Sequence, residues 1–76
     1  MTDRDEIDRI RGQYSSAMGD YEAATDAMRQ FDRDLFDGPV LDLGIVVQEA
    51  QDLKREEDMS YKRLSRARET YFRALR

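Results

Sequence analysis

Nine apolar or small residues recur with the spacing of a coiled-coil seam across the first half of the chain. Alternately three and four residues apart, they are Ile7, Ile10, Tyr14, Ala17, Tyr21, Ala24, Met28, Phe31 and Leu35. A heptad pattern sustained over four heptads is typical of a long helix that packs through one narrow stripe. The sequence therefore predicts a helix over residues 3–36. Thr2 or Asp3 is its expected cap, with Glu6 placed after Asp3 as in a capping box.

The segment Asp37-Gly38-Pro39 ends this pattern. Gly38 suits the left-handed conformation that follows many helices, and Pro39 fits the first turn of a new helix. The next eight residues, VLDLGIVV, are mostly apolar and would point all round a helix. We interpret residues 37–39 as a corner and expect the apolar cluster beyond it to form a contact surface. As an alternative, Pro39–Val47 forms a short helix of its own, which would make a three-helix fold.

A second long helix is predicted over residues 39–75. Its residues at helical spacing are Ala50, Leu53, Tyr61, Leu64, Ala67, Tyr71 and Leu75. The polar stretch Lys54–Ser60 interrupts them and places Glu57 where an apolar residue is expected. We therefore predict an eleven-residue step from Leu53 to Leu64, which would locally relax a supercoil.

Together these patterns predict an all-α fold, an antiparallel, coiled-coil-like helical hairpin that forms a single domain over residues 1–76. Folding back about Gly38 pairs residue i with roughly residue 75 − i. The expected neighbours are Tyr61 and Tyr14, Leu64 and Ile10, Val47 and Met28, and Leu43 and Phe31. Acidic residues of the first turns would then lie beside Arg66, Arg68 and Arg73, and these pairs would favour the antiparallel orientation.

One side of the first helix is unusually small. Ser15, Gly19 and Ala23 recur every four residues, with Gly12 and Ser16 close by. Such a row, here called the lean row, lets another helix approach closely. Alternatively, Gly19 is a tolerated weak point that costs about 1 kcal/mol relative to alanine.

Composition argues that the hairpin needs a partner. Apolar residues make up 39% of the chain and charged residues another 39%, with a mean hydropathy of −0.88. A domain of 76 residues buries a smaller fraction of its surface than a larger domain does, so this is little apolar material for an independent core. We expect dimerisation or a partner helix to complete the fold.

The chemistry of the residues argues against an enzyme. The chain has neither cysteine nor histidine, which removes thiol chemistry and the commonest general base and metal ligand. Carboxylate pairs such as Asp32 and Asp34 are interpreted as solvated surface, and DRDLFDG lacks the ligand spacing of a calcium loop. No catalytic, metal-binding or cofactor-binding residue is expected.

Charge is distributed unevenly along the chain. The formal net charge is −4, but residues 20–58 alone contribute −8, while residues 1–19 contribute −1 and residues 59–76 contribute +5. A hairpin would therefore have an acidic corner half and a basic terminal half. Overall acidity argues against general nucleic-acid or membrane affinity. The absence of a long apolar run or an export signal predicts a cytoplasmic protein without a membrane span.

These features favour protein–protein interaction over catalysis. The preferred interpretation is an adaptor or chaperone subunit that shields an amphipathic helix of a partner; self-association into a four-helix bundle remains open. An acidic inhibitor or decoy for a basic site is the main alternative. An RNA-binding hairpin dimer is a lesser one, since the basic segment YKRLSRARETYFRALR places Tyr61 and Tyr71 on the predicted seam. The candidate contact residues are Val40, Leu41, Ile45, Val46, Ser15, Gly19 and Ala23.

The central segment RDLFDGPVLDLGIVVQEAQDL, residues 33–53, resembles the small helical-hairpin co-chaperones of type III secretion needle subunits. The shared features are a first helix ending at a glycine turn, a proline, and an alanine-containing second helix. Small size, acidity and the lack of cysteine also agree. The resemblance implies a cytoplasmic, partner-stabilised hairpin that keeps an aggregation-prone subunit soluble.

Overall fold

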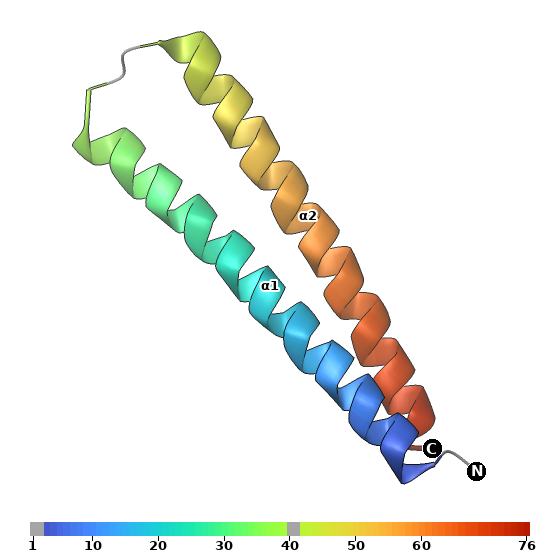
Figure 1. The fold of residues 1–76 in the computed structure, drawn as a ribbon. Coiled ribbons are helices and arrows are strands. Elements are labelled where there is room, and N and C mark those ends of the chain that lie inside the picture. Colours follow the sequence, from blue (N-terminus) through green and yellow to red (C-terminus); the bar gives the residue numbers. More distant parts are fainter. Residues whose placement is uncertain (1–2, 40–41) are drawn as a thin grey trace.

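The computed structural model, which describes residues 3–39 and 42–76, is a two-helix antiparallel hairpin. Helix α1 spans Arg4–Asp37 and helix α2 spans Leu43–Ala74. The two helices lie side by side along their length, with both termini at one end (Figure 1). The molecule measures 58 × 17 × 14 Å. The predicted all-α hairpin is therefore confirmed.

Helix α2 begins later than the sequence predicted. Its N-cap is Asp42, whose Oδ1 accepts hydrogen bonds from the backbone N–H groups of Gly44 at 2.8 Å and Ile45 at 3.3 Å. Pro39 thus precedes the helix and does not occupy its first turn. Because Leu43–Val47 forms the start of α2, the described residues contain no separate third helix at the corner, and that alternative is wrong.

Gly38 ends α1 for a different reason from the one predicted. Its φ of −116° is extended rather than left-handed, and its N–H donates to the Asp34 carbonyl oxygen at 3.0 Å. A Cβ at this position would lie 3.1 Å from that oxygen. The close approach of the chain to the last turn of α1, and not a positive φ, therefore favours glycine here.

The Asp42 cap leads to a direct stability prediction. Asp42→Ala leaves two N–H groups of α2 without their acceptor and should cost about 1 kcal/mol of unfolding free energy, measured by urea denaturation. Asp42→Asn keeps an acceptor oxygen at the same position and should stay within a few tenths of a kcal/mol of wild type. Equal losses in the two variants would show that the cap does not stabilise the helix.

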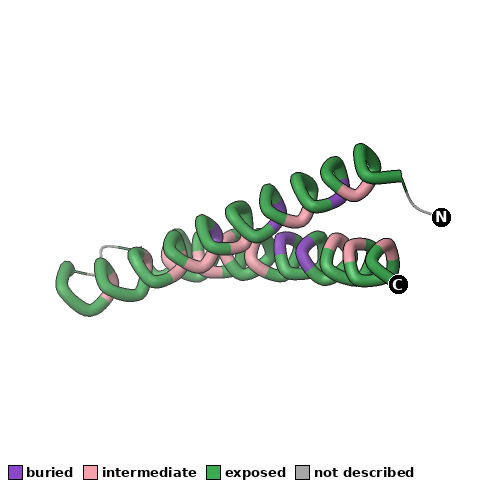
Figure 2. The backbone as a smooth tube through the Cα atoms, turned by 90° about the horizontal axis from the view of Figure 1, so that it is seen from below, coloured by how far each residue is buried: buried purple, intermediate pink, exposed green. Residues whose placement is uncertain are grey.

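The predicted seam of α1 is confirmed. All nine of its residues are buried or half-buried, and Ile10, Ala17 and Ala24 are the most buried of them. They all face α2 because residues three or four positions apart lie on the same side of a helix. In Figure 2 the buried positions lie between the helices. Ala24 is the buried residue nearest the corner, and the described residues from Thr25 to Met59 are half-buried or exposed.

The seam of α2 differs from the prediction. Its buried and half-buried residues are Val46, Ala50, Leu53, Glu57, Ser60, Leu64, Ala67, Tyr71 and Ala74. These follow an unbroken heptad spacing, so the predicted eleven-residue step is wrong. The period of a regular helix does not change where its residues are polar, so Glu57 and Ser60 lie in the seam. Tyr61 and Leu75 lie outside it and are 54% and 53% exposed.

The register is also shifted from the prediction. Tyr21 packs against Tyr61 with ring centroids 5.7 Å apart, and Tyr14 packs against Tyr71 at 5.6 Å, both with tilted rings. The predicted pairing of Tyr61 with Tyr14 is therefore wrong. The helices are joined by five residues, 38–42, rather than by a tight reversal at Gly38, and this displaces α2 along α1. As a result Ser60 lies at about the height of Ala24.

The predicted ion pairs between the helices do not occur among the described residues. The pairs that form, such as Arg11 with Asp8 at 2.6 Å and Arg73 with Glu69 at 2.8 Å, join residues of one helix. Exposed pairs of this kind each contribute about 0–1 kcal/mol. Between the helices, Arg68 Nε donates a hydrogen bond to the Tyr14 hydroxyl at 3.3 Å. The apolar seam and the aromatic contacts therefore set the orientation.

Candidate functional site

The corner half of the hairpin contains an open groove of about 410 Å³ between the helices. Its floor is formed by Phe31 and Leu35 from α1 and by Val46 and Leu53 from α2, all of them half-buried. The remaining lining residues are Ala27, Gln30, Asp34, Pro39 and Glu49. Thus the seam residues nearest the corner are only partly covered by the opposite helix.

A second hollow of about 390 Å³ continues the groove toward the middle of the rod. The two hollows share Ala27, and the second is lined by Asp20, Ala23, Ala24, Ala27, Glu56 and Arg63. Most of the residues along its edges directly precede a seam residue in the sequence. Because each residue turns a helix by 100°, these positions lie on one side of the hairpin, here called the groove flank.

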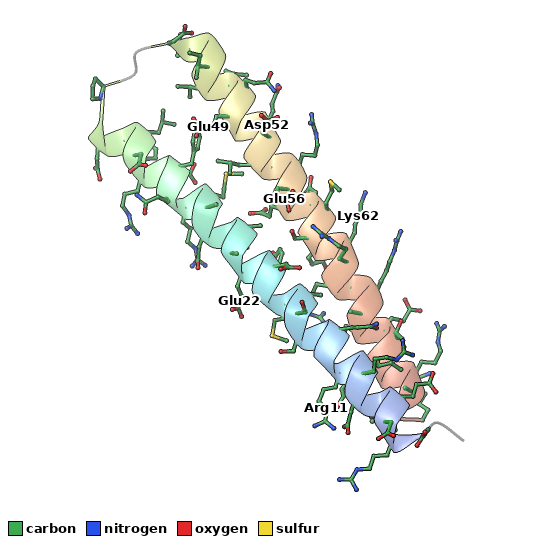
Figure 3. The ribbon with its side chains drawn as sticks, in the orientation of Figure 1. Arg11, Glu22, Glu49, Asp52, Glu56 and Lys62 are labelled. Atoms are coloured by element: carbon green, nitrogen blue, oxygen red, sulfur yellow. The ribbon has the colours of Figure 1, made fainter. Side chains whose placement is uncertain are left out.

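The edge of the groove flank is mainly acidic. Asp34 and Glu49 border the first hollow, and Asp20 and Glu56 border the second. In Figure 3, Glu49 and Glu56 lie on the side of α2 that faces α1. Arg63 is the cation of this edge, and it is paired with Glu56 at 3.3 Å. An apolar floor with carboxylates along both sides favours an occupant with apolar and basic groups.

The opposite side of the hairpin carries the aromatic contacts. Tyr14 lies against Phe72, with ring centroids 6.4 Å apart, in addition to its contact with Tyr71. Tyr61 and Phe72 directly follow the seam residues Ser60 and Tyr71, so they project to the side away from the groove. We call this side the aromatic flank.

The lean row crosses the back of α1, from Ser15, which directly follows the seam residue Tyr14, to Ala23, which directly precedes the seam residue Ala24. Ser15 and Gly19 are exposed, and a Cβ on Gly12 or Gly19 would meet nothing within 4 Å. These residues lie on the back of α1, turned away from α2. At a rise of 1.5 Å per residue, Gly19 is about 27 Å along the helix from the corner. Only Ala23 reaches the groove flank.

The structure thus divides the predicted contact residues. Val46 and Ala23 line the two hollows, and the exposed Ile45 lies beside Glu49 of the groove, one turn away on α2. Ser15 and Gly19 lie elsewhere, and Val40 and Leu41 fall outside the described residues. Whether any of these residues contacts a partner stays a prediction.

Sequence reasoning assigned three of the four floor residues, Phe31, Leu35 and Leu53, to the seam, and it predicted Val46 as a contact residue. The heptad pattern correctly indicated that Phe31, Leu35 and Leu53 point between the helices, but it did not show that the corner half leaves them open. One signal was available. The residues of α2 that would cover them include Glu49 and the glycine at position 44, and neither supplies apolar volume.

The clustered charges near the middle of α2 form ordinary surface pairs. Lys54 Nζ lies 3.3 Å from Asp58 and 3.7 Å from Glu57. The hydrogen bond to Asp58 and the charges of Asp58 and Glu57 raise the pKa of the Lys54 ammonium above its usual value. The Lys54 ammonium is therefore charged at neutral pH, and on the alkaline side the pairs are lost as the pH rises through that raised pKa. Across residues 3–39 and 42–76, no cluster of carboxylates has the arrangement of a metal site.

Comparison with protein-family models, with curated proteins and with solved structures found no match to this chain. Within the part of the chain that the structure describes, neither helix has an apolar stretch long enough to cross a membrane.

Proposed function

We propose that the hairpin is a protein-interaction module that binds an amphipathic helix of a partner protein along its groove flank. The observation that carries this proposal is the open groove of about 410 Å³ over Phe31, Leu35, Val46 and Leu53. A helix can place apolar residues at positions i, i+3, i+4 and i+7 into such a groove. Covering these four side chains would remove apolar surface from water, which favours binding.

The charge of the corner half specifies the chemistry of the partner. Residues 20–58 carry a net charge of −8, and Asp34 and Glu49 border the groove itself. A partner helix with lysine or arginine beside its apolar stripe would pair with these carboxylates. Such pairs at the edge accelerate association and select the partner more than they add affinity.

Shielding a partner helix is the action of an adaptor or chaperone subunit. The segment that resembles type III secretion co-chaperones, residues 33–53, supplies Asp34, Leu35, Pro39, Val46, Glu49 and Leu53 to the groove. This overlap supports the chaperone form of the proposal. Its main competitor is an acidic decoy that binds a basic site through charge alone, a role favoured by the same −8 half.

The test uses groove-filling variants and a defined probe. The probe is a synthetic amphipathic helix of leucine and lysine, about 18 residues or five turns long, compared with a scrambled peptide of the same composition. Ala27 is exposed and lines both hollows, so Ala27→Trp should fill the groove without removing a seam contact. We expect Ala27→Trp to weaken peptide binding, measured by calorimetry, by at least tenfold, about 1.4 kcal/mol.

Ser15→Trp is the matched control. It adds the same side chain to an exposed position of the same helix, on the back of α1, and should leave binding unchanged. If Ser15→Trp weakens binding while Ala27→Trp does not, the lean row and not the groove is the binding surface. The decoy alternative predicts that the scrambled peptide binds equally well and that binding collapses at high salt.

A further inference from the structure

The apolar side chains that stay exposed gather on the aromatic flank. Among the described residues, six of the nine large exposed apolar side chains lie on this side, and the exceptions are Leu43, Ile45 and Met59. The six are Met18, Phe36, Val47, Tyr61, Phe72 and Leu75, whereas Leu43 lies seven residues before Ala50 and continues the seam. Most of them directly follow a seam residue, whereas Ile45 and Met59 directly precede one. The hairpin therefore carries a second apolar stripe, on the side away from the groove.

This stripe is symmetric along α2. Val47, Tyr61 and Leu75 occupy one heptad position and are spaced evenly on either side of Tyr61. Tyr21 and Tyr61, whose rings are in contact, both lie near the midpoints of their helices. A two-fold axis through this point would bring Tyr61 against its own copy and Val47 against Leu75 of the second copy. Such self-complementarity is what an isologous interface requires.

The surface of the single hairpin is large for its mass. It exposes 6141 Å², whereas a compact folded protein of 9.0 kDa is expected to expose about 4,900 Å². The excess of roughly 1,200 Å² exceeds the roughly 800 Å² that each partner buries in a standard protein interface. Pairing of two hairpins through one flank would remove a surface of this size.

Charge selects the direction of pairing. The corner half carries −8 from residues 20–58, and the terminal half carries +4 from the two chain ends. Parallel pairing would place one acidic half against the other, whereas antiparallel pairing places each acidic half against a basic one. The hairpin is 58 Å long, so in the antiparallel pair the acidic halves of the two copies lie at opposite ends. Their separation then exceeds the screening length of about 8 Å at physiological salt.

The cations within the stripe are compatible with pairing. Lys54 and Arg68 lie between the three symmetric residues at the same heptad position. Lys54 is paired with Asp58, and Arg68 donates to the Tyr14 hydroxyl, so both charged groups already have a partner. Their aliphatic stems can cover apolar neighbours while the charged ends stay in water.

We infer that the aromatic flank is a homodimer interface, through which two hairpins pair antiparallel into a four-helix bundle. The two groove flanks then face outward on opposite sides of the bundle. This inference is independent of the proposed partner helix, because it concerns the other flank and a second copy of the same chain.

Sedimentation equilibrium over a concentration series tests the pairing. Val47 and Met59 are 52% and 51% exposed, on the aromatic flank and the groove side respectively, so Val47→Glu and Met59→Glu form a matched pair. We expect wild type and Met59→Glu to dimerise and Val47→Glu to raise the dimer dissociation constant at least tenfold. Circular dichroism checks that both variants remain helical. A wild-type chain that stays monomeric at every concentration, or equal effects of the two variants, would overturn the inference.

The direction of pairing has its own test, which the absence of native cysteine permits. A mixture of Val47→Cys and Leu75→Cys chains should oxidise to a mixed disulfide dimer containing one chain of each kind. Raising the salt concentration should weaken the dimer, because its opposite charges are screened. Disulfides formed mainly between identical variants, or a dimer strengthened by salt, would show that the pairing is not antiparallel.

Discussion

Leu64→Ala is expected to remove a large part of the stability of the hairpin. Leu64 is 4% exposed, and Ile10 is the other large apolar side chain among the buried residues. Truncation of a buried leucine costs about 2–5 kcal/mol, from lost burial and from the cavity that remains. Since a domain of this length has a total stability of roughly 4–11 kcal/mol, the loss should be a substantial fraction of the whole.

The effect of Leu64→Ala is measured by thermal unfolding followed by circular dichroism at a fixed protein concentration. Each kcal/mol shifts the midpoint of a domain of this size by about 4–8 °C, so we expect a decrease of roughly 10 °C or more. Met59→Ala truncates an exposed side chain one turn away and should change stability by less than about 0.5 kcal/mol. Similar decreases in the two variants would contradict the assignment of Leu64 to the core.

The concentration of the core near Leu64 explains why the two halves of the hairpin differ. Ile10, Ala17, Ala24, Ser60 and Leu64 are the buried residues of the described chain, and all lie in the terminal half or at its border with the corner half. The corner half contributes half-buried residues that line the groove. The terminal half can therefore hold the helices together while the corner half presents apolar surface to a partner.

The first helix could be predicted from sequence almost to the residue. Its nine-residue seam is apolar or small throughout, so only one phase of the heptad pattern satisfies it. In the second helix, Glu57 and Ser60 occupy seam positions, while the nearby Tyr61 offers a more apolar alternative. Choosing positions by hydrophobicity therefore placed five of the seven predicted residues correctly but selected Tyr61 and Leu75 where the seam has Ser60 and Ala74, because the helix period is set by backbone hydrogen bonds and not by side-chain polarity.

The corner could not be predicted in the same way. The sequence-based prediction started the second helix at Pro39 and did not consider Asp42 as its N-cap. In the structure, the two hydrogen bonds accepted by Asp42 fix the start of α2 instead. Because α2 starts later, the connection is longer than predicted and α2 is displaced along α1. The cross-helix neighbours derived from a tight turn at Gly38 are displaced with it. The groove depends on that register, which is why Phe31, Leu35 and Leu53 were assigned to the seam and not to an open groove.

The two flanks assign separate roles to the apolar residues that the hairpin leaves uncovered. If the aromatic flank pairs two copies, each dimer carries two grooves facing outward, and one dimer could hold two partner helices. Binding of either kind would stabilise the folded hairpin by mass action. A hairpin with few buried residues would then gain stability from the assembly in which it works.

Glu57→Leu tests this view, because it should stabilise the single hairpin without any partner. Glu57 occupies a seam position with its side chain only 22% exposed, and its carboxylate lies 3.7 Å from Lys54. Leucine at this position would bury most of its side chain, worth about 1.5–3 kcal/mol when complete. The lost ion pair costs about 0–1 kcal/mol, and the helix propensities of leucine and glutamate are similar. We expect a net gain of about 1–2 kcal/mol in unfolding free energy.

The matched control for Glu57→Leu is Asp58→Leu. Both substitutions introduce leucine and remove a carboxylate that pairs with Lys54, but Asp58 is exposed and outside the seam. Thermal unfolding should show an increase of about 4–8 °C per kcal/mol for Glu57→Leu and little change for Asp58→Leu. If dimerisation supplies stability that the polar seam lacks, the thermal unfolding midpoint of wild type should rise with protein concentration. The unfolding midpoint of Glu57→Leu should then depend less on protein concentration. Equal stabilisation by both variants would instead mean that relief of surface charge, and not burial in the seam, is the cause.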